Sequence, residues 1–170
     1  DCRLFQLVHA GWAPADGTSA GGASTGEMGD GADGGVVVRA EVPALGETLD
    51  LYDAVGWSAY TAHPETLERS LLGSRHVVTA RRDGALIGLA RVVGDGAVLA
   101  YLQDVLVCPE AQGQGIGRRL VEEVLAPFDA VRQQVLLTDA EPGQRAFYEA
   151  LGFVEAHDHD PGLRSFVRLR

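Results

Sequence analysis

The chain has 170 residues, 46% of them hydrophobic, which predicts one domain with one sizeable core. Its 14 basic residues, all arginine, and 24 acidic residues leave a net charge of −10, the wrong sign for a general nucleic-acid binder. No apolar run reaches 18 residues, and no basic segment leads into a long apolar stretch, so we expect neither a membrane span nor a secretory signal.

The cysteines indicate a reducing compartment. Cys2 and Cys108 make an unpersuasive disulfide pair, and a cytoplasmic protein with reduced thiols fits better. Cys108 precedes a proline and has no base near it in the sequence, so we do not expect it to be a catalytic thiol.

The first 35 residues differ in composition from the rest. Residues 11–35 hold nine of the 22 glycines, four acidic residues and one large aliphatic side chain, Met28. Such a segment has little apolar surface to offset the entropy of ordering, so residues 1–35 are expected to be a flexible extension of a domain over 36–170. Residues 4–8 are compatible with a short strand or with docking on the surface.

From residue 36 the pattern alternates between strand and helix. The β-branched run at 36–42 predicts a strand, and apolar residues at helical spacing over 45–55 predict a helix. Residues 61–65, with a capping threonine and an early proline, open a second helix to about Leu72. Three antiparallel strands are expected next, over 76–81, 85–93 and 97–107, with tight turns at 83–84 and 94–96.

The remainder predicts one crossover and a final pair of strands. A glycine-rich loop leads into a helix that ends near Pro127, followed by a strand at 134–138 and a helix at 142–151 capped by Gly152. Two strands, 153–155 and 163–169, are expected to complete the sheet. The order β-α-α-β-β-β-α-β-α-β-β predicts a mixed α/β (α+β) fold with a mostly antiparallel central sheet and helices on both faces.

The loop after the third strand carries the chemical signal. Glycines at 113, 115 and 117 join the end of a strand to the start of a helix, so unpaired backbone N–H groups and the positive end of a helix dipole face one spot. Such a spot binds phosphate, and glycine allows the close approach that a Cβ would obstruct. A P-loop requires a lysine, which the chain lacks, and a dinucleotide fold places its loop after the first strand of a parallel sheet.

Two motifs together resemble a known family. The pattern Gln112-x-x-Gly115-x-Gly117 follows the strand that ends at Val107, and further along comes the run from Phe147 through Tyr148 to Phe153. Together they resemble the GNAT superfamily of N-acetyltransferases over about residues 36–169. The resemblance implies that the loop backbone holds the pyrophosphate of acetyl-CoA, and that the strand at 105–107 splays from the strand at 134–138 to admit the pantetheine arm. The coenzyme-binding residues expected on this basis are Val105, Leu106, Val107, Gln112, Gly113, Gln114, Gly115, Ile116, Gly117 and Arg118.

The resemblance also implies a general acid. Tyr148 is expected near the coenzyme sulfur, where a phenol that is protonated at neutral pH can give a proton to the leaving thiolate. The alternative is a core aromatic packed on Phe147. The backbone N–H of Val107 is expected to stabilise the developing oxyanion.

The acceptor side is read from five residues. Asp104 is the candidate general base, with pairing to an arginine or capping of a bulge as alternatives, and Gln103 and Tyr101 could orient the substrate instead. Trp57 and Tyr60 lie in a region that folds over the acceptor site in the family, and they suit a cation or a flat ring, or simple packing.

Two features fall outside the family pattern. Glu141 stands where many members carry an asparagine that meets the coenzyme. The run of alternating histidine and aspartate at 157–160 suggests metal ligands, but adjacent residues on a turn rarely converge on one ion, so we expect a polar loop and no metal.

The function expected is transfer of an acetyl group from acetyl-CoA to a primary amine by direct attack in a ternary complex. A small amine such as an arylalkylamine or a polyamine is favoured, and a protein N-terminus or lysine is the next choice. A non-catalytic module that binds acyl-CoA is the alternative, because a phosphate cradle specifies binding and not turnover. The sequence leaves open whether the protein is a monomer or a homodimer.

Overall fold

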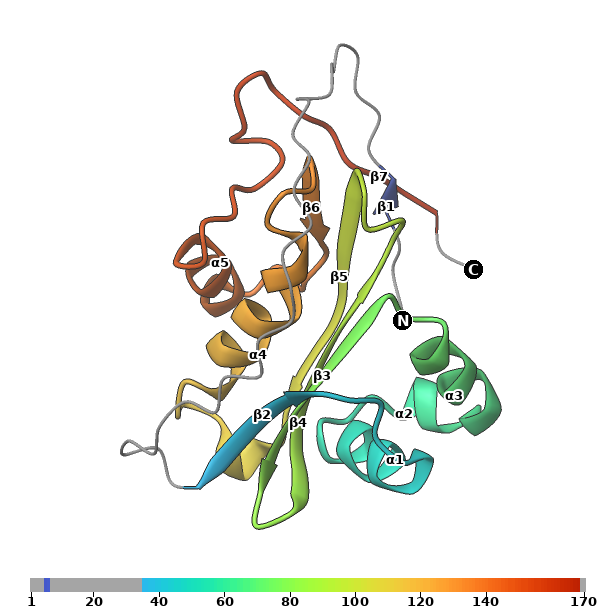
Figure 1. Ribbon diagram of the computed structural model, residues 1–170. Helices are drawn as coiled ribbons and strands as arrows, with labels where there is room; N and C mark the ends of the chain where they lie inside the picture. The colour runs from blue at the N-terminus through green and yellow to red at the C-terminus, as the bar shows by residue number, and fades with distance from the viewer. Residues whose placement is uncertain (1–4, 7–34, 169–170) are drawn as a thin grey trace.

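The main sheet has five strands in the order β2-β3-β4-β5-β6, in a computed structural model that describes residues 5–6 and 35–168 (Figure 1). Every neighbouring pair is antiparallel except β5 and β6, which are parallel. The mixed, mostly antiparallel sheet predicted from the sequence is therefore confirmed. The strands are β2 (Val36–Ala40), β3 (His76–Arg82), β4 (Ala85–Val93), β5 (Leu99–Val107) and β6 (Gln133–Leu136).

Helices cover both faces of this sheet, as predicted. Three lie together on one side and two on the other (Figure 1). The short helix α2 was not expected from the sequence. The first group is α1 (Leu45–Ala54), α2 (Ser58–Thr61) and α3 (Pro64–Leu72), and the second is α4 (Ile116–Leu125) and α5 (Pro142–Glu149), with 3₁₀ turns η1 (Pro109–Ala111) and η2 (Ala126–Phe128) flanking α4.

The sheet separates two apolar layers. Alternate residues of a strand point to opposite faces, so β4 sends Leu89 toward α1 and α3 and Ala90 toward α4. On the α1 side the layer is built from Leu51, Tyr52, Leu67, Leu71, Val77, Leu89 and Leu106. On the α4 side Ile116, Leu120, Val121 and Val124 pack on buried residues of β3, β4 and β5.

The loop between β4 and β5 explains why β5 begins two residues later than predicted. Asp95 Oδ1 accepts hydrogen bonds from the backbone N–H groups of Ala97, Val98 and Leu99, which therefore close a turn instead of extending the strand. Gly94 has φ +138°, and a Cβ there would lie 2.3 Å from the carbonyl oxygen of Leu99. Only glycine fits at this position.

The prediction that two final strands complete the main sheet is wrong. Residues 153–155 form no strand, and β7 (Phe166–Val167) pairs antiparallel with β1 (Phe5–Gln6), not with β6. Arg145 of α5 donates to Glu155 (3.2 Å) and Asp158 (2.8 Å). These contacts direct the segment after α5 toward the helix and not toward the edge of β6.

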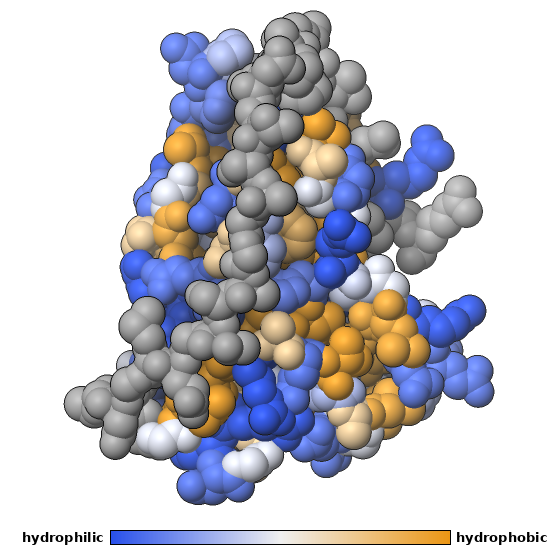
Figure 2. All heavy atoms as spheres, viewed as in Figure 1, coloured by the Kyte–Doolittle hydropathy of each residue, from blue (hydrophilic) through white to orange (hydrophobic). Residues whose placement is uncertain are grey.

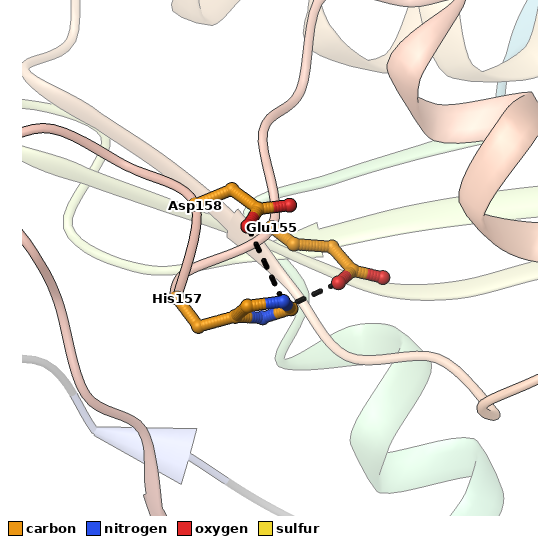
Figure 3. Close-up of side chains that lie close together, drawn as sticks. All are labelled: Glu155, His157 and Asp158. Carbon is orange, nitrogen blue, oxygen red and sulfur yellow. Dashed lines mark ion pairs between the residues drawn. The ribbon is translucent and has the colours of Figure 1, made fainter.

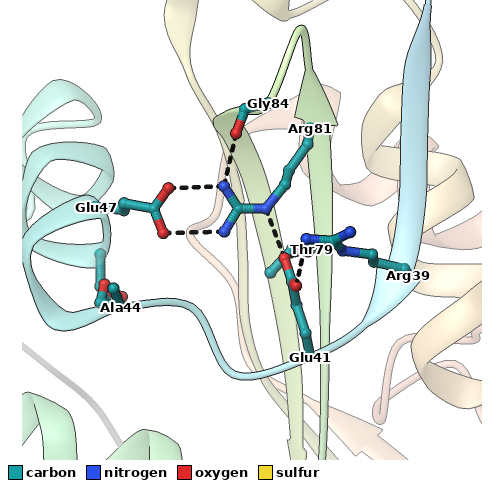
Figure 4. Close-up of polar contacts among 8 residues, drawn as sticks. Arg39, Glu41, Ala44, Glu47, Thr79, Arg81 and Gly84 are labelled. Carbon is teal, nitrogen blue, oxygen red and sulfur yellow. Dashed lines mark hydrogen bonds and ion pairs between the residues drawn. The ribbon is translucent and has the colours of Figure 1, made fainter.

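A polar network ties α1 to the sheet (Figure 4). Arg81 of β3 donates to Glu41 (2.6 Å) and forms two hydrogen bonds with Glu47 of α1, at 2.7 and 2.9 Å. Burial alone raises the pKa of Glu41, but hydrogen bonds from Thr79, Arg81 and Arg39 outweigh it and lower this pKa to about 2. The hydrogen bonds between Arg81 and Glu47 hold the helix that carries Tyr52.

The surface mixes polar and apolar residues. Figure 2 shows hydrophilic residues over much of one face, with apolar residues gathered over the part formed by α1 to α3. Among the described residues, no helix is both long and apolar enough to cross a membrane. The predicted glycine-rich extension, apart from residues 5–6 and 35, and Cys2 lie outside the described residues, while Cys108 is half-buried with a free thiol.

Candidate active site

The parallel strands β5 and β6 pair over only part of their length. Their register runs from Leu99 with Gln133 to Leu102 with Leu136, where β6 ends. Strand β5 continues to Val107. The splayed arrangement expected for residues 105–107 is therefore present, with an open edge on the β6 side of β5.

The backbone orientation decides which groups reach this edge. The N–H of Cys108 donates to the carbonyl of Ile87 on β4 (2.9 Å), and in an antiparallel ladder such hydrogen-bonded residues alternate with residues that face away. Val107 and Val105 therefore direct their N–H and C=O groups to the open edge. Leu106 directs its backbone to β4 and buries its side chain on the α1 side.

A β-bulge sets the direction of Asp104. Arg91 pairs with Asp104, but the next residue of β4, Val92, pairs with Leu102, so Gln103 is the extra residue. The bulge turns Asp104 toward α1, although Leu102, two residues earlier, packs on the α4 side.

The glycine loop has the geometry of an anion cradle. Gly113 and Gly115 have φ of +73° and +78°, and a Cβ at either position would meet no atom within 4 Å. Gly115 is the N-cap of α4, and no side chain caps this helix. The first N–H groups of a helix have no acceptor within the helix, so the loop offers them to a ligand. These residues fit a bound pyrophosphate.

Two glutamines brace the loop. The side-chain amide of Gln112 donates to the carbonyl of Val107 (3.0 Å), and that of Gln114 donates to the carbonyl of Glu110 (3.2 Å). Arg82, at the end of β3, donates to Gln114 Oε1 (2.6 Å). The sequence analysis missed Arg82, because nothing in the pattern connects it with a loop 32 residues away.

The helix after the loop packs against α5. A Cβ on Gly117 would lie 3.6 Å from the ring of Phe147, an ordinary van der Waals contact, so this position lies directly against α5. Arg118, about half exposed, contacts Glu122 (3.3 Å) and the carbonyl of Ala150 (3.3 Å). It thus lies at the predicted place but is engaged with protein groups.

One cavity of about 840 Å³ lies beside the open edge. It brings together most of the predicted catalytic and acceptor residues, which come from segments far apart in the sequence. Its lining includes Trp57, Tyr60, Tyr101, Gln103, Asp104, Val105, Thr138, Asp139, Gln144 and Tyr148.

Tyr148 lies both against the core and on this cavity. Its ring makes edge contacts with Phe147 (5.0 Å between centroids) and Phe153 (5.9 Å). Burial raises the pKa of its hydroxyl to about 12, so the phenol stays protonated at neutral pH. The two interpretations offered by the sequence, packing residue and proton donor, are therefore compatible.

Asp104 is only 2% exposed and is held on one of its two oxygens. The hydroxyl of Tyr52 donates to Oδ2 (2.8 Å), and Nε of the buried Arg91 donates to the same atom. Arg91 also contacts the carbonyl of Ser70 and the hydroxyl of Ser74, both at 3.3 Å. Asp104 thus pairs with an arginine, as one alternative predicted, while its Oδ1 is buried with no hydrogen-bond partner among the described residues.

Three aromatic rings adjoin this carboxylate. Trp57 and Tyr60 stack with centroids 5.7 Å apart at 26°, and Tyr52 contacts both, at 6.0 and 5.4 Å. Tyr52 lies in the helix predicted over 45–55, and neither it nor Arg91 was expected at the site. An arginine in an otherwise apolar strand was the available signal, because such a charge needs a buried partner.

The histidine run after α5 brings one candidate metal cluster together among the described residues (Figure 3). His157 Nδ1 lies 3.3 Å from Glu155, and its Nε2 lies 3.4 Å from Asp158. Arg145 contacts both carboxylates and also Glu149, so their charge is only partly compensated. The absence of a metal from the reaction stays a prediction.

Comparisons with known proteins agree with the geometry. A family model described as an acetyltransferase (GNAT) domain matches residues 48–164. An uncharacterized N-acetyltransferase, ycf52, of Pyropia yezoensis is 27% identical over 73% of this chain and 72% of its own length. The chloroplastic serotonin N-acetyltransferase 2 of Oryza sativa subsp. japonica is 36% identical over 51% of this chain, but over only 43% of its own length.

Solved structures extend the likeness to three dimensions. A GNAT family acetyltransferase from Streptococcus pneumoniae superposes with a TM-score of 0.64 and 35% identity, covering 70% of this chain and 87% of the other. AAC(6')-Iy, in complex with the bisubstrate analog CoA-S-monomethyl-acetylneamine, has a TM-score of 0.58 at 19% identity over 71% of this chain and 91% of its own, and shares the fold. The matched domain, the splayed sheet and the glycine loop show that this chain belongs to the GNAT family and is an acetyl-CoA-dependent N-acetyltransferase.

Proposed function

We propose that this enzyme acetylates a small primary amine, with an arylalkylamine or a polyamine as the favoured acceptor, by direct attack on acetyl-CoA in a ternary complex. The observation that carries the proposal is a single cavity, beside the open end of β5, that Trp57, Asp104 and Tyr148 line together. An acceptor and a thioester that enter such a cavity are brought within reach of each other and of ionisable groups.

Coenzyme binding is proposed in two parts. The pyrophosphate lies against the backbone of residues 112–117, with charge supplied by Arg118 once it leaves Glu122. The pantetheine arm runs along the open edge and hydrogen-bonds to Val105 and Val107, as an added strand would. Gln112, which donates to the carbonyl of Val107, stands at the junction of the two parts.

The chemistry then requires three proton transfers. The ammonium of the acceptor loses a proton to Oδ1 of Asp104, and the neutral nitrogen forms a bond to the acetyl carbon while the N–H of Val107 faces the carbonyl oxygen. The carbon–sulfur bond breaks, the Tyr148 hydroxyl gives its proton to the sulfur, and the nitrogen, positively charged since its attack, gives its second proton to solvent. The products are the N-acetylated amine and free coenzyme A; Asp104 returns its proton to solvent and Tyr148 regains one from it.

Features of the cavity support this acceptor class. The stacked pair of Trp57 and Tyr60 offers aromatic faces beside a carboxylate, which suits a cation attached to a ring or a short chain. The printed name of the rice relative, a serotonin N-acetyltransferase, supports an arylalkylamine. Cavity volume, about 840 Å³, is in the range of small-molecule sites.

A thiol-release assay tests the proposal. Wild type is assayed with 2-phenylethylamine, spermidine and a short peptide, and Tyr148→Phe should lower kcat by roughly 100-fold while its affinity for CoA stays unchanged. Turnover of the peptide alone would move the acceptor to protein N-termini or lysines. CoA binding without turnover of any acceptor would favour the non-catalytic module.

Three further expectations remain predictions. They are a cytoplasmic location, the choice between monomer and homodimer, and the division of the chain at residue 35. Cell fractionation, sedimentation velocity and limited proteolysis test them in turn.

A further inference from the structure

The acceptor end of the cavity carries charge of one sign. Among the described residues that line it, the ionisable groups other than tyrosines are Asp104 and Asp139, and no arginine, lysine or histidine is among them. Arg91 lies behind Asp104, is 5% exposed and does not line the cavity. An anion that enters the cavity therefore meets the exposed Asp139 and the Asp104–Arg91 ion pair, and the described lining residues offer it no arginine, lysine or histidine to pair with.

The state of Asp104 points to a bound cation. Buried polar atoms in folded proteins are nearly always hydrogen-bonded, because an unsatisfied one loses its contacts with water without replacement. Oδ1 of Asp104 is buried without a partner, while Oδ2 takes both available donors, from Tyr52 and Arg91. The carboxylate is thus anchored on one side and unsatisfied on the other, and it lines the cavity.

We propose that Tyr52 and Arg91 are positioning residues that hold Asp104 so that its Oδ1 receives the ammonium of the acceptor, and that this site takes amines but rejects amino acids. The inference rests on the proposed function and adds that the substrate must lack a carboxylate on the carbon beside its ammonium.

The discrimination has an electrostatic origin. An ammonium beside Oδ1 gains a charge-assisted hydrogen bond and lies near the faces of Trp57 and Tyr60. A carboxylate on the adjacent carbon of the same ligand is carried toward Asp139 and Asp104, where it loses contacts with water and gains no cationic partner among the described lining residues. Amines without that carboxylate escape this penalty.

Three ligands that share one ring and one ammonium test the idea. 2-Phenylethylamine, phenylalanine and phenylalaninamide are titrated by calorimetry into the enzyme saturated with CoA, so that the reading is independent of turnover. We expect the amine and the amide to bind within about fivefold of each other, and phenylalanine to bind at least about 30-fold more weakly.

Each other result overturns the proposal. If all three ligands bind equally, the site does not discriminate against a carboxylate. If phenylalaninamide binds as weakly as phenylalanine, the discrimination is steric and not electrostatic. If none of the three binds, Asp104 does not form an ammonium site. Binding in the expected order with no thiol release would instead overturn the proposed function and leave the ammonium site standing. Replacing the exposed Asp139 by asparagine should reduce the difference in affinity between phenylalanine and phenylalaninamide.

The positioning role needs a variant that keeps the fold. Tyr52→Phe removes the hydroxyl that donates to Asp104 and retains the fully buried ring. Thr79→Val is the matched control, because it removes a buried hydroxyl that donates to Glu41 (2.6 Å), away from the cavity.

Both substitutions should lower thermal stability. Only Tyr52→Phe should weaken the binding of 2-phenylethylamine, by about fivefold, with the affinity for CoA unchanged. If the amine binds equally well to Tyr52→Phe and Thr79→Val, Tyr52 has only a structural role and the proposal fails.

Discussion

Replacing Gly115 by alanine tests whether the glycine loop binds CoA, because the substitution affects protein stability and CoA affinity by different amounts. Gly115 has φ +78°, and an added Cβ would touch no protein atom within 4 Å. The cost to the free enzyme is therefore that of the left-handed backbone alone, about 1 kcal/mol, or a fall in Tm of roughly 3 °C.

The free energy of CoA binding should change by more than the free energy of unfolding. The new methyl group occupies the space from which a phosphate reaches the first N–H groups of α4. Losing one charge-assisted hydrogen bond costs about 1.5–3 kcal/mol, so we expect CoA to bind roughly 10- to 100-fold more weakly by calorimetry.

Gly84→Ala supplies the control. Gly84 lies in the turn between β3 and β4 with φ +83°, a Cβ there also meets no atom within 4 Å, and the position does not line the active-site cavity. It should lose similar stability and retain the affinity for CoA. If Gly115→Ala bound CoA as tightly as Gly84→Ala, the loop would not be the pyrophosphate site.

Three other predictions concern single residues. Because the pKa of Tyr148 is raised to about 12, kcat in stopped-flow assays should show no loss of the general acid between pH 7 and 10, and a Tyr148-dependent fall near pH 8 would contradict that role. Glu41→Gln should lower the free energy of unfolding by about 2 kcal/mol at pH 7, since the folded pKa of about 2 lies below the ordinary 4.5 and the side chain is only 23% exposed. This contribution is complete above about pH 5 and is lost as the pH falls toward 2, so urea titrations of wild type and variant should converge at low pH; a constant gap would refute the assignment. Gly94→Ala, whose Cβ would lie 2.3 Å from the carbonyl oxygen of Leu99, should cost more than about 3 kcal/mol, and a thermal melt close to that of wild type would show that the loop tolerates a side chain.

Local patterns predicted the order of the elements as far as α5, apart from the short helix α2. The meander, the helix after the loop and the crossover all appear in the expected order, with ends shifted by a few residues where side chains such as Asp95 capture backbone donors. The last two strands could not be predicted correctly, because Arg145 draws Glu155 and Asp158 toward α5, and the pairing of β7 with β1 joins the two ends of the chain.

The sequence by itself determined the glycine loop, the strand before it and the tyrosine motif, because each depends on neighbours within a few residues. Only the tertiary structure decided the surroundings of Asp104: the bulge at Gln103 turns it, Arg91 and Tyr52 hold one oxygen, and the other is left buried and unpartnered. The reason is physical. A turn or a helix cap is a local preference, whereas the partner of a buried charge is chosen by which strands and helices pack together.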